Sequence, residues 1–230
     1  MKSYIWTLPT RVFHWSLAIA FTTTYILGDF DKFENLHFAF GAFVGSLILF
    51  RIIFGIIGPK YSNFKDFPIG LKHQKGFIKD YFSKAKNYAG HNPTAAVVML
   101  LIFIIGLICS ISGYLLYATE NNVLSLGIQD DSLKEVHEVL ANTFLILVIA
   151  HLLGILGDIM FHKKTGTFQS IFTGHKNIEA SNAKLNTFHK IYVLFWFIVP
   201  LYLFFLAYNL PINNNETTKQ NSEQYEDDDD

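Results

Sequence analysis

Long apolar stretches dominate the pattern of hydrophobic and polar positions in this chain of 230 residues. Five stretches are candidates for membrane spans, and they cover residues 12–28, 36–57, 94–117, 133–160 and 191–210. A helix of about 20 apolar residues crosses the hydrocarbon core of a bilayer. The pattern therefore predicts an all-α membrane protein with five transmembrane helices, of which the first is short and the last contains Pro200.

Composition agrees with a membrane protein and excludes several kinds of site. Charged residues make up 16% of the chain, against about 25% in average soluble domains. The single cysteine, Cys109, lies in an apolar stretch, so an intramolecular disulfide is excluded. The chain also lacks the Cys-x-x-Cys-His motif that attaches a c-type haem.

The charges are segregated in a way that predicts an orientation. With the N-terminus in the cytoplasm and alternating spans, three segments face the cytoplasm: residues 1–11, 51–91 and 158–190. They carry every lysine and arginine except Lys32, Lys134 and Lys219. Because positively charged loops stay on the cytoplasmic side, we expect a cytoplasmic N-terminus and a C-terminus on the opposite side.

The longest connection, residues 59–92, is basic and is predicted to be a solvated loop near anionic lipid. The alternative is an interfacial amphipathic helix, because Phe77, Ile78, Tyr81 and Phe82 recur at helical spacing. The tail after Pro211 is rich in asparagine, glutamate and aspartate, and we expect it to be disordered.

Four of the nine histidines lie in the apolar stretches at matching depths. Ionisable residues inside spans are costly and are functional candidates by default. His137 and His151 are fourteen residues apart, which corresponds to about 1400° of helix rotation and a rise of about 21 Å. Both therefore project from one face of the fourth stretch, one in each leaflet. His137 can meet His37 in the outer leaflet, and His151 can meet His14 in the inner leaflet.

Two facing imidazoles in a membrane indicate a particular cofactor. Zinc needs three or four protein ligands close together, and no third ligand lies at the right depth near these histidines, apart from Glu138 at the boundary. A tetrapyrrole fills the four equatorial positions of a metal itself, so haem fits better. Four phenylalanines would offer it apolar walls and two glycines would leave room for a porphyrin edge: Phe13, Phe38, Phe40 and Phe144, with Gly41 and Gly45. The alternative is four core histidines satisfied by hydrogen bonds across helices. Arg11 and Arg51 are candidate partners for haem propionates or lipid phosphates.

Several motifs resemble the bacterial cytochrome b561 family, which includes the b-type cytochrome subunits of nickel–iron hydrogenases. The resemblance covers about residues 5–175. It is carried by the segment from Trp6 to Trp15, by His37 with Gly41, by the arginine and glycines of residues 51–64, by Gly-His-Asn-Pro at 90–93, and by the His137 and His151 pair. Two positions depart from the family pattern: Thr7 stands where an acidic residue is common, and Asn63 stands where a basic residue is common.

The resemblance implies a transmembrane four-helix bundle around two non-covalent b haems, plus a fifth C-terminal transmembrane helix outside the matching region. Its axial ligands would be the pairs His14 with His151 and His37 with His137. It also implies electron transfer between quinone or quinol and a redox partner protein, which could be hydrogenase, a periplasmic cytochrome or another oxidoreductase. The chain would then be an electron-transfer subunit in the bacterial inner membrane rather than a stand-alone enzyme.

The predicted organisation has three parts: a di-haem membrane domain over residues 1–175, a linker and fifth helix over 176–210, and the acidic tail over 211–230. We expect membrane lipid as a partner and no nucleic acid. Two other functions remain open. One is a membrane oxidoreductase that acts directly on superoxide or a metal, and the other is a non-redox scaffold or transporter.

Overall fold

The computed structural model describes residues 1–80, 88–124, 130–161 and 165–211. Its five long helices are α1 (Leu8–Leu27), α2 (Glu34–Ile57), α4 (Pro93–Glu120), α5 (Asp130–Phe161) and α7 (Thr187–Tyr208). The shorter elements are β1 (Ser3–Tyr4), η1 (Asp31–Phe33), η2 (Phe64–Asp66), α3 (Leu71–Asp80), α6 (Thr167–Thr173) and β2 (His175–Lys176). The prediction of an all-α chain is confirmed, since the two strands are only two residues long each.

Four helices in the described part of the chain are long and apolar enough to cross a membrane: α2 with η1, α4, α5 and α7. The chain is therefore a multi-pass membrane protein. Helix α1 is not among the four, because its 20 residues include Arg11, His14 and four threonines. The hydroxyls of Thr22, Thr23 and Thr24 donate to carbonyls one turn earlier in α1. A fifth span formed by α1 stays a prediction.

The long helices begin where the sequence supplies caps. The side chain of Asn92 accepts a hydrogen bond from the backbone N–H of Ala95, and Pro93 opens α4. Asn186 and His189 form a reciprocal capping box at the start of α7. Both arrangements satisfy N–H groups that the first turn of a helix leaves unpaired. They fix where each helix begins.

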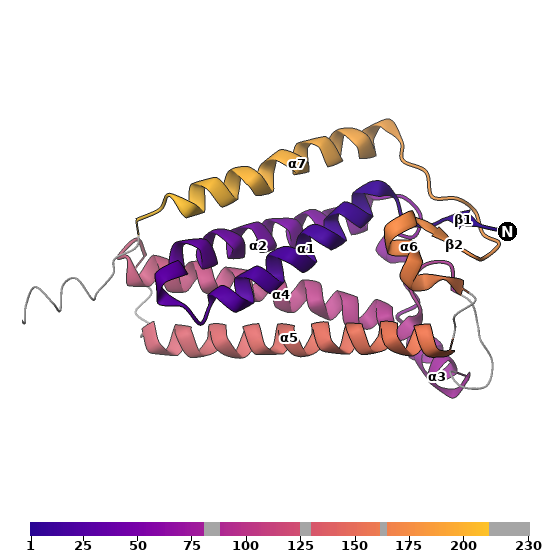
Figure 1. Ribbon diagram of the computed structural model, residues 1–230, viewed down its shortest axis with the longest axis horizontal. Helices are drawn as coiled ribbons and strands as arrows, with labels where there is room; N and C mark the ends of the chain where they lie inside the picture. The colour runs from indigo at the N-terminus through magenta and orange to yellow at the C-terminus, as the bar shows by residue number, and fades with distance from the viewer. Residues whose placement is uncertain (81–87, 125–129, 162–164, 212–230) are drawn as a thin grey trace, which may run out of the picture.

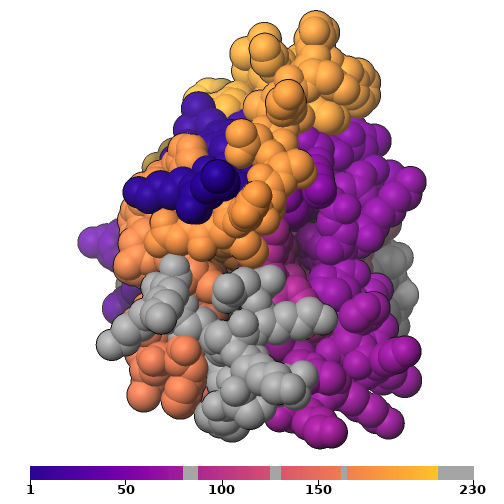
Figure 2. Space-filling view, turned by 90° about the vertical axis from the view of Figure 1, so that its right-hand side faces the viewer, coloured from indigo at the N-terminus to yellow at the C-terminus, as the bar shows by residue number. Residues whose placement is uncertain are grey.

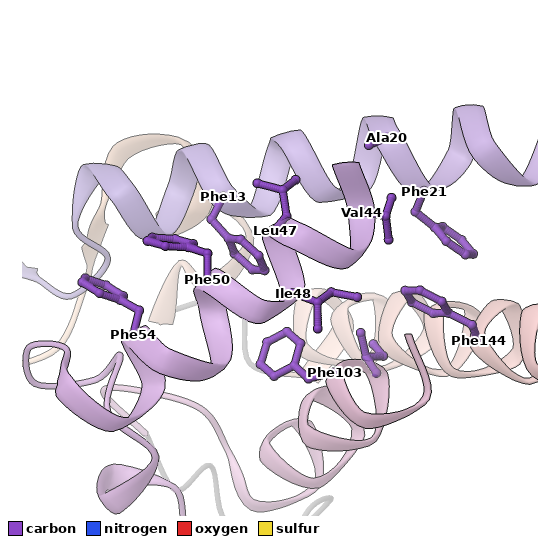
Figure 3. Packing of buried hydrophobic residues seen from close by; sticks show 11 residues of the cluster. Phe13, Ala20, Phe21, Val44, Leu47, Ile48, Phe50, Phe54, Phe103 and Phe144 are labelled. Atoms are coloured by element: carbon purple, nitrogen blue, oxygen red, sulfur yellow. The ribbon is translucent and has the colours of Figure 1, made fainter. Parts of the chain in front are cut away.

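Helix α2 is the centre of the packing, because it contacts α1, α4 and α7. Phe50 of α2 meets Phe13 of α1, which in turn meets Phe103 of α4 in the main buried cluster (Figure 3). Helix α7 lies along α2, where Tyr192 donates from its hydroxyl to the carbonyl of Phe50. Helix α5 packs mainly along α4, so its opposite flank faces α1 without extensive backbone contact in the described residues. A flat group could be held between these two helices.

One end of the bundle carries β1, β2, α3 and α6, and we call it the capped end (Figure 1). Strand β1 pairs with β2 in antiparallel register, and the indole N–H of Trp6 donates to the hydroxyl of Ser170 at 2.9 Å. Figure 2 views this end and shows the N-terminal residues lying against the segment that precedes α7. Gly174 has a φ of 81°, and a Cβ there would lie 2.7 Å from the carbonyl oxygen of Trp6.

Three expectations for the connections have different outcomes. Residues 176–186 are joined to the N-terminus, because Ala183 donates its N–H to the carbonyl of Tyr4, so this part of the expected linker packs against the bundle. The predicted loop 59–92 contains a described helix, α3, so the expectation of a loop throughout is wrong. Tyr81 and Phe82, with which the amphipathic alternative continued, lie outside the described residues, as does the predicted disordered tail 212–230.

Candidate functional site

His37 and His137 form a pair near the end of the bundle opposite the capped end. Their ring centroids lie 6.1 Å apart with an interplanar angle of 84°. His37 comes from the first turns of α2 and His137 from the first third of α5. The two helices do not pack closely along each other in the described residues. The side chains therefore reach across the space between them.

Hydrogen bonds define the tautomers of this pair. The Nδ1 of His37 lies 2.9 Å from the carbonyl oxygen of Thr24, which can only accept, so this Nδ1 carries the proton. The Nδ1 of His137 lies 2.9 Å from the hydroxyl oxygen of Ser112, whose own proton goes to the carbonyl of Cys109. His137 therefore also donates from Nδ1. Both Nε2 atoms are left with a lone pair, as in histidines that bind metals.

His14 and His151 form the second pair, nearer the capped end. Their ring centroids lie 6.3 Å apart at an angle of 54°. His14 lies in the second turn of α1, and its Nδ1 is buried without a hydrogen-bond partner. A buried polar nitrogen without a partner costs free energy. The structure thus brings together the same two pairs that the sequence predicts.

The spacing within each pair fits one metal ion held from two sides. Two imidazole nitrogens on opposite sides of a metal lie about 4 Å apart, which puts the ring centres roughly 6 Å apart. The observed spacings are 6.1 and 6.3 Å. Among the described residues, no group of three or more His, Cys, Asp or Glu side chains could hold a metal ion. The remaining ligands would have to come from a macrocycle, and the four histidines fit haem.

An aromatic pair separates the two histidine pairs. Phe21 of α1 and Phe144 of α5 lie with ring centroids 4.3 Å apart (Figure 3). Phe144 is seven residues from both His137 and His151, so it projects from the same face of α5 midway between them. A Cβ on Gly106 of α4 would lie 2.7 Å from its ring. The glycine therefore makes room for the phenylalanine.

The other residues expected at the site are distributed differently. Phe13 packs in the core against Phe50 and Phe103, and Phe38 stacks on Tyr117 of α4. Phe40 lies against Phe204 of α7, on the flank of α2 away from α5. Gly41 has open space where a Cβ would be, as expected for room beside a cofactor.

Two small residues have roles that the sequence did not assign. Gly45, where room for a porphyrin edge is expected, instead lies against Ser110 of α4, so it allows two helices to approach closely. Ser112 orients His137 through a hydrogen bond. The sequence signal for this role is weak, since Ser112 merely follows Cys109 by three residues in a helix with few polar residues. The carbonyl of Thr24, which orients His37, gives no signal in the sequence.

The remaining histidines lie outside the two pairs. His189 lies 2.9 Å from the carbonyl of Ile57 through Nε2, His73 and His175 are exposed, and His162 lies outside the described residues. His91 precedes α4, where its ring contacts Trp6 and Phe67. Its pKa is lowered well below the usual value, first by burial and then by neighbouring positive charges. It also lines a cavity of about 270 Å³ at the capped end.

Comparisons with known proteins point to one family. The model of the prokaryotic cytochrome b561 family matches residues 5–174. A probable Ni/Fe-hydrogenase B-type cytochrome subunit from Rhodobacter capsulatus is 28% identical over 144 residues, which cover 50% of this chain and 55% of that protein. A protein of the same description from Azotobacter chroococcum mcd 1 is 24% identical over 144 residues, 50% of this chain and 59% of its own length.

The matches to these curated relatives therefore span less than two thirds of their length. No solved structure matches the chain. The family match, by contrast, covers α1, α2, α4 and α5 together with all four paired histidines. The chain belongs to the prokaryotic cytochrome b561 family.

Proposed function

We propose that this protein is a di-haem b-type cytochrome that carries electrons between quinone or quinol and a redox partner protein. The observation that carries the proposal is the pair of histidine sites, with ring centroids 6.1 and 6.3 Å apart at two depths of one bundle. Family membership supports haem as the occupant. Haem iron supplies one-electron chemistry, with a redox potential tuned by its ligands and surroundings.

The chain's own residues would restrict the cofactors to electron transfer. Two histidines holding each haem iron would leave no position for a substrate to bind, which disfavours direct chemistry on superoxide. Ser112 and the Thr24 carbonyl hold two of the imidazoles in the tautomer that presents Nε2. Phe21 and Phe144 fill the space between the two sites and keep water out of it.

The orientation and the partner are parts of the same proposal. The capped end carries the basic segments of the chain, so it would face the cytoplasm. The pair His14 and His151 would then hold the inner haem, and His37 with His137 the outer one. Helix α1 would be a fifth span beside the four apolar ones. The relatives' description suggests a hydrogenase as one candidate for the redox partner.

Haem content and reduction by quinol test the proposed function. Protein purified from membranes should contain two haems per chain, both low-spin and six-coordinate, and a quinol should reduce them rapidly. A folded protein without haem would contradict the proposal outright. Efficient turnover with superoxide or a metal chelate in the absence of any partner would favour the stand-alone oxidoreductase instead.

The variant Gly113→Ala tests the outer site. A Cβ at Gly113 would lie 2.9 Å from Cε1 of His137, so the imidazole would have to move. We expect haem affinity at this site to fall on the order of tenfold, as measured by haem loss to apomyoglobin.

The matched control is Gly154→Ala on α5, where nothing lies within 4 Å of the added Cβ. It should leave both haems unchanged. Equal haem retention in Gly113→Ala and Gly154→Ala would mean that His137 does not hold its haem from the observed position.

A further inference from the structure

Arg51 is a buried charge without a partner. It lies in α2 near the capped end, and its side chain is 2% exposed. Its Nη1 is buried without a hydrogen-bond partner, and in the described part of the chain no carboxylate pairs with it. A guanidinium stays protonated in proteins, so it cannot avoid the cost by losing its charge. An uncompensated buried charge is expensive, and a missing anion is the simplest explanation.

The surroundings of Arg51 are aromatic rather than lipid. Its guanidinium carbon lies 5.3 Å from the ring centre of Phe64 and 5.4 Å from that of Phe103. Cation–π contacts of this kind offset part of the desolvation cost. They do not supply hydrogen-bond acceptors for the guanidinium N–H groups. Because the side chain is enclosed by η2 and α4, the phosphate of a bulk lipid cannot reach it.

Two more basic side chains lie close to this position. The Nδ1 of His91 is buried without a hydrogen-bond partner, and the charge of Arg51 contributes to the low pKa of His91. Lys176 donates to the carbonyls of Tyr88 and Gly90. Burial lowers the pKa of Lys176 to about 8, and Asp158 opposes this shift. Burial thus favours the neutral form of His91, whereas Arg51 and Lys176 bring positive charge into the interior of the capped end.

The depth of Arg51 matches that of the inner histidine pair. Phe13 and Phe50, which precede His14 and Arg51 in the sequence, have ring centroids 6.1 Å apart. Arg51 and His14 thus lie at a similar level on the neighbouring helices α2 and α1. His91 is also close enough to His14 and His151 for an electrostatic interaction with each of them. Arg51 and His91 therefore border the space beside the inner histidine pair.

We infer that Arg51, assisted by an N–H of His91, binds the carboxylates of the inner haem. This inference rests on the proposed function, because it requires a haem between His14 and His151. Haem carries two propionates, which need cationic or N–H partners when they are buried. The unpaired Nη1 of Arg51 is a donor of that kind, and the unpaired Nδ1 of His91 is a second one in the tautomer that places the proton there. Arg51 would then raise the midpoint potential of the inner haem, because positive charge near the iron favours its reduced form.

Redox titration of the purified holoprotein tests this inference. In Arg51→Gln, the ratio of reduced to oxidised inner haem at a fixed potential should fall at least tenfold, which is 59 mV for a one-electron couple. The outer haem should titrate as in the wild type. Arg51→Lys keeps the charge and should recover most of the shift. Lys65→Gln removes an exposed charge at the same end and should change little, because water and salt screen it.

Each outcome bears on the inference separately from the proposed function. A wild-type protein without an inner haem would refute the proposed function. An Arg51→Gln protein whose inner haem is retained at the wild-type potential would refute only the anion site. Loss of both haems in both the Gln and Lys variants would show a general structural role and also overturn the inference. A wild-type inner potential that follows the phosphate concentration would mean that Arg51 binds a free anion instead of the propionates.

Discussion

Replacing His151 with leucine should halve the haem content of the protein and leave the outer haem in place. His151 and His14 lie 6.3 Å apart between ring centroids, so loss of either ring would leave the proposed inner haem with one protein ligand. The helix should persist, because leucine is favourable in a membrane helix. Haem-to-protein ratios and low-temperature absorption spectra would show one low-spin haem per chain instead of two.

His73→Leu is the matched control for this prediction. His73 is an exposed histidine of α3 outside both pairs, and its replacement should leave two haems. The variant His37→Leu should show the converse loss of the outer haem. If His151→Leu retains two haems with unchanged spectra, the pairing of His14 with His151 is wrong.

Replacing Phe144 with alanine should destabilise the protein by about 3–5 kcal/mol, as large-to-small changes in cores do. Phe144 is 3% exposed and lies against Phe21, Ile48 and Gly106. Its removal would open a void midway between the histidine pairs. Both haem sites should then lose haem faster, which is unlike the one-site effect of a histidine variant. Unfolding by a strong detergent titrated into mild micelles measures the change in stability.

Two further variants show whether packing is the cause. Leu153→Ala shortens a side chain of α5 that is 62% exposed, and it should cost little. Phe144→Leu keeps the side chain apolar and leaves a smaller void, so it should cost less than Phe144→Ala. A Phe144→Ala protein as stable as Leu153→Ala would mean that the aromatic pair does not hold α1 against α5.

The pairing of the histidines could be predicted from the sequence because it depends on helix geometry alone. The fourteen-residue spacing of His137 and His151 fixes a common face, and alternating spans fix which histidines share a depth. The same reasoning places Phe144 between them. Helix positions followed from apolar length, but α1 did not meet the requirement for a span because polar residues interrupt it.

The contacts that orient the histidines could not be predicted in this way. A backbone carbonyl such as that of Thr24 carries no sequence signal, and the role of Ser112 depends on how α4 is rotated against α5. Phe40 illustrates the same difficulty, since its contact with Phe204 requires knowledge of where α7 packs. The sequence leaves two candidate partners for Arg51, haem propionates and lipid phosphates. The enclosure of its side chain by η2 and α4 argues against lipid phosphate, and this enclosure is visible only in the structure.

The pairing of β1 with β2 has a consequence for the order in which the protein is made. Ser3 pairs with Lys176, so this contact joins residues separated by most of the synthesised chain. The pairing cannot form until the ribosome has released residue 176, after α1, α2, α4 and α5 have been translated. Contacts between distant residues also form slowly. The end of the bundle nearest His14 can therefore close only after these four helices have been made, which leaves a period for cofactor insertion from that side.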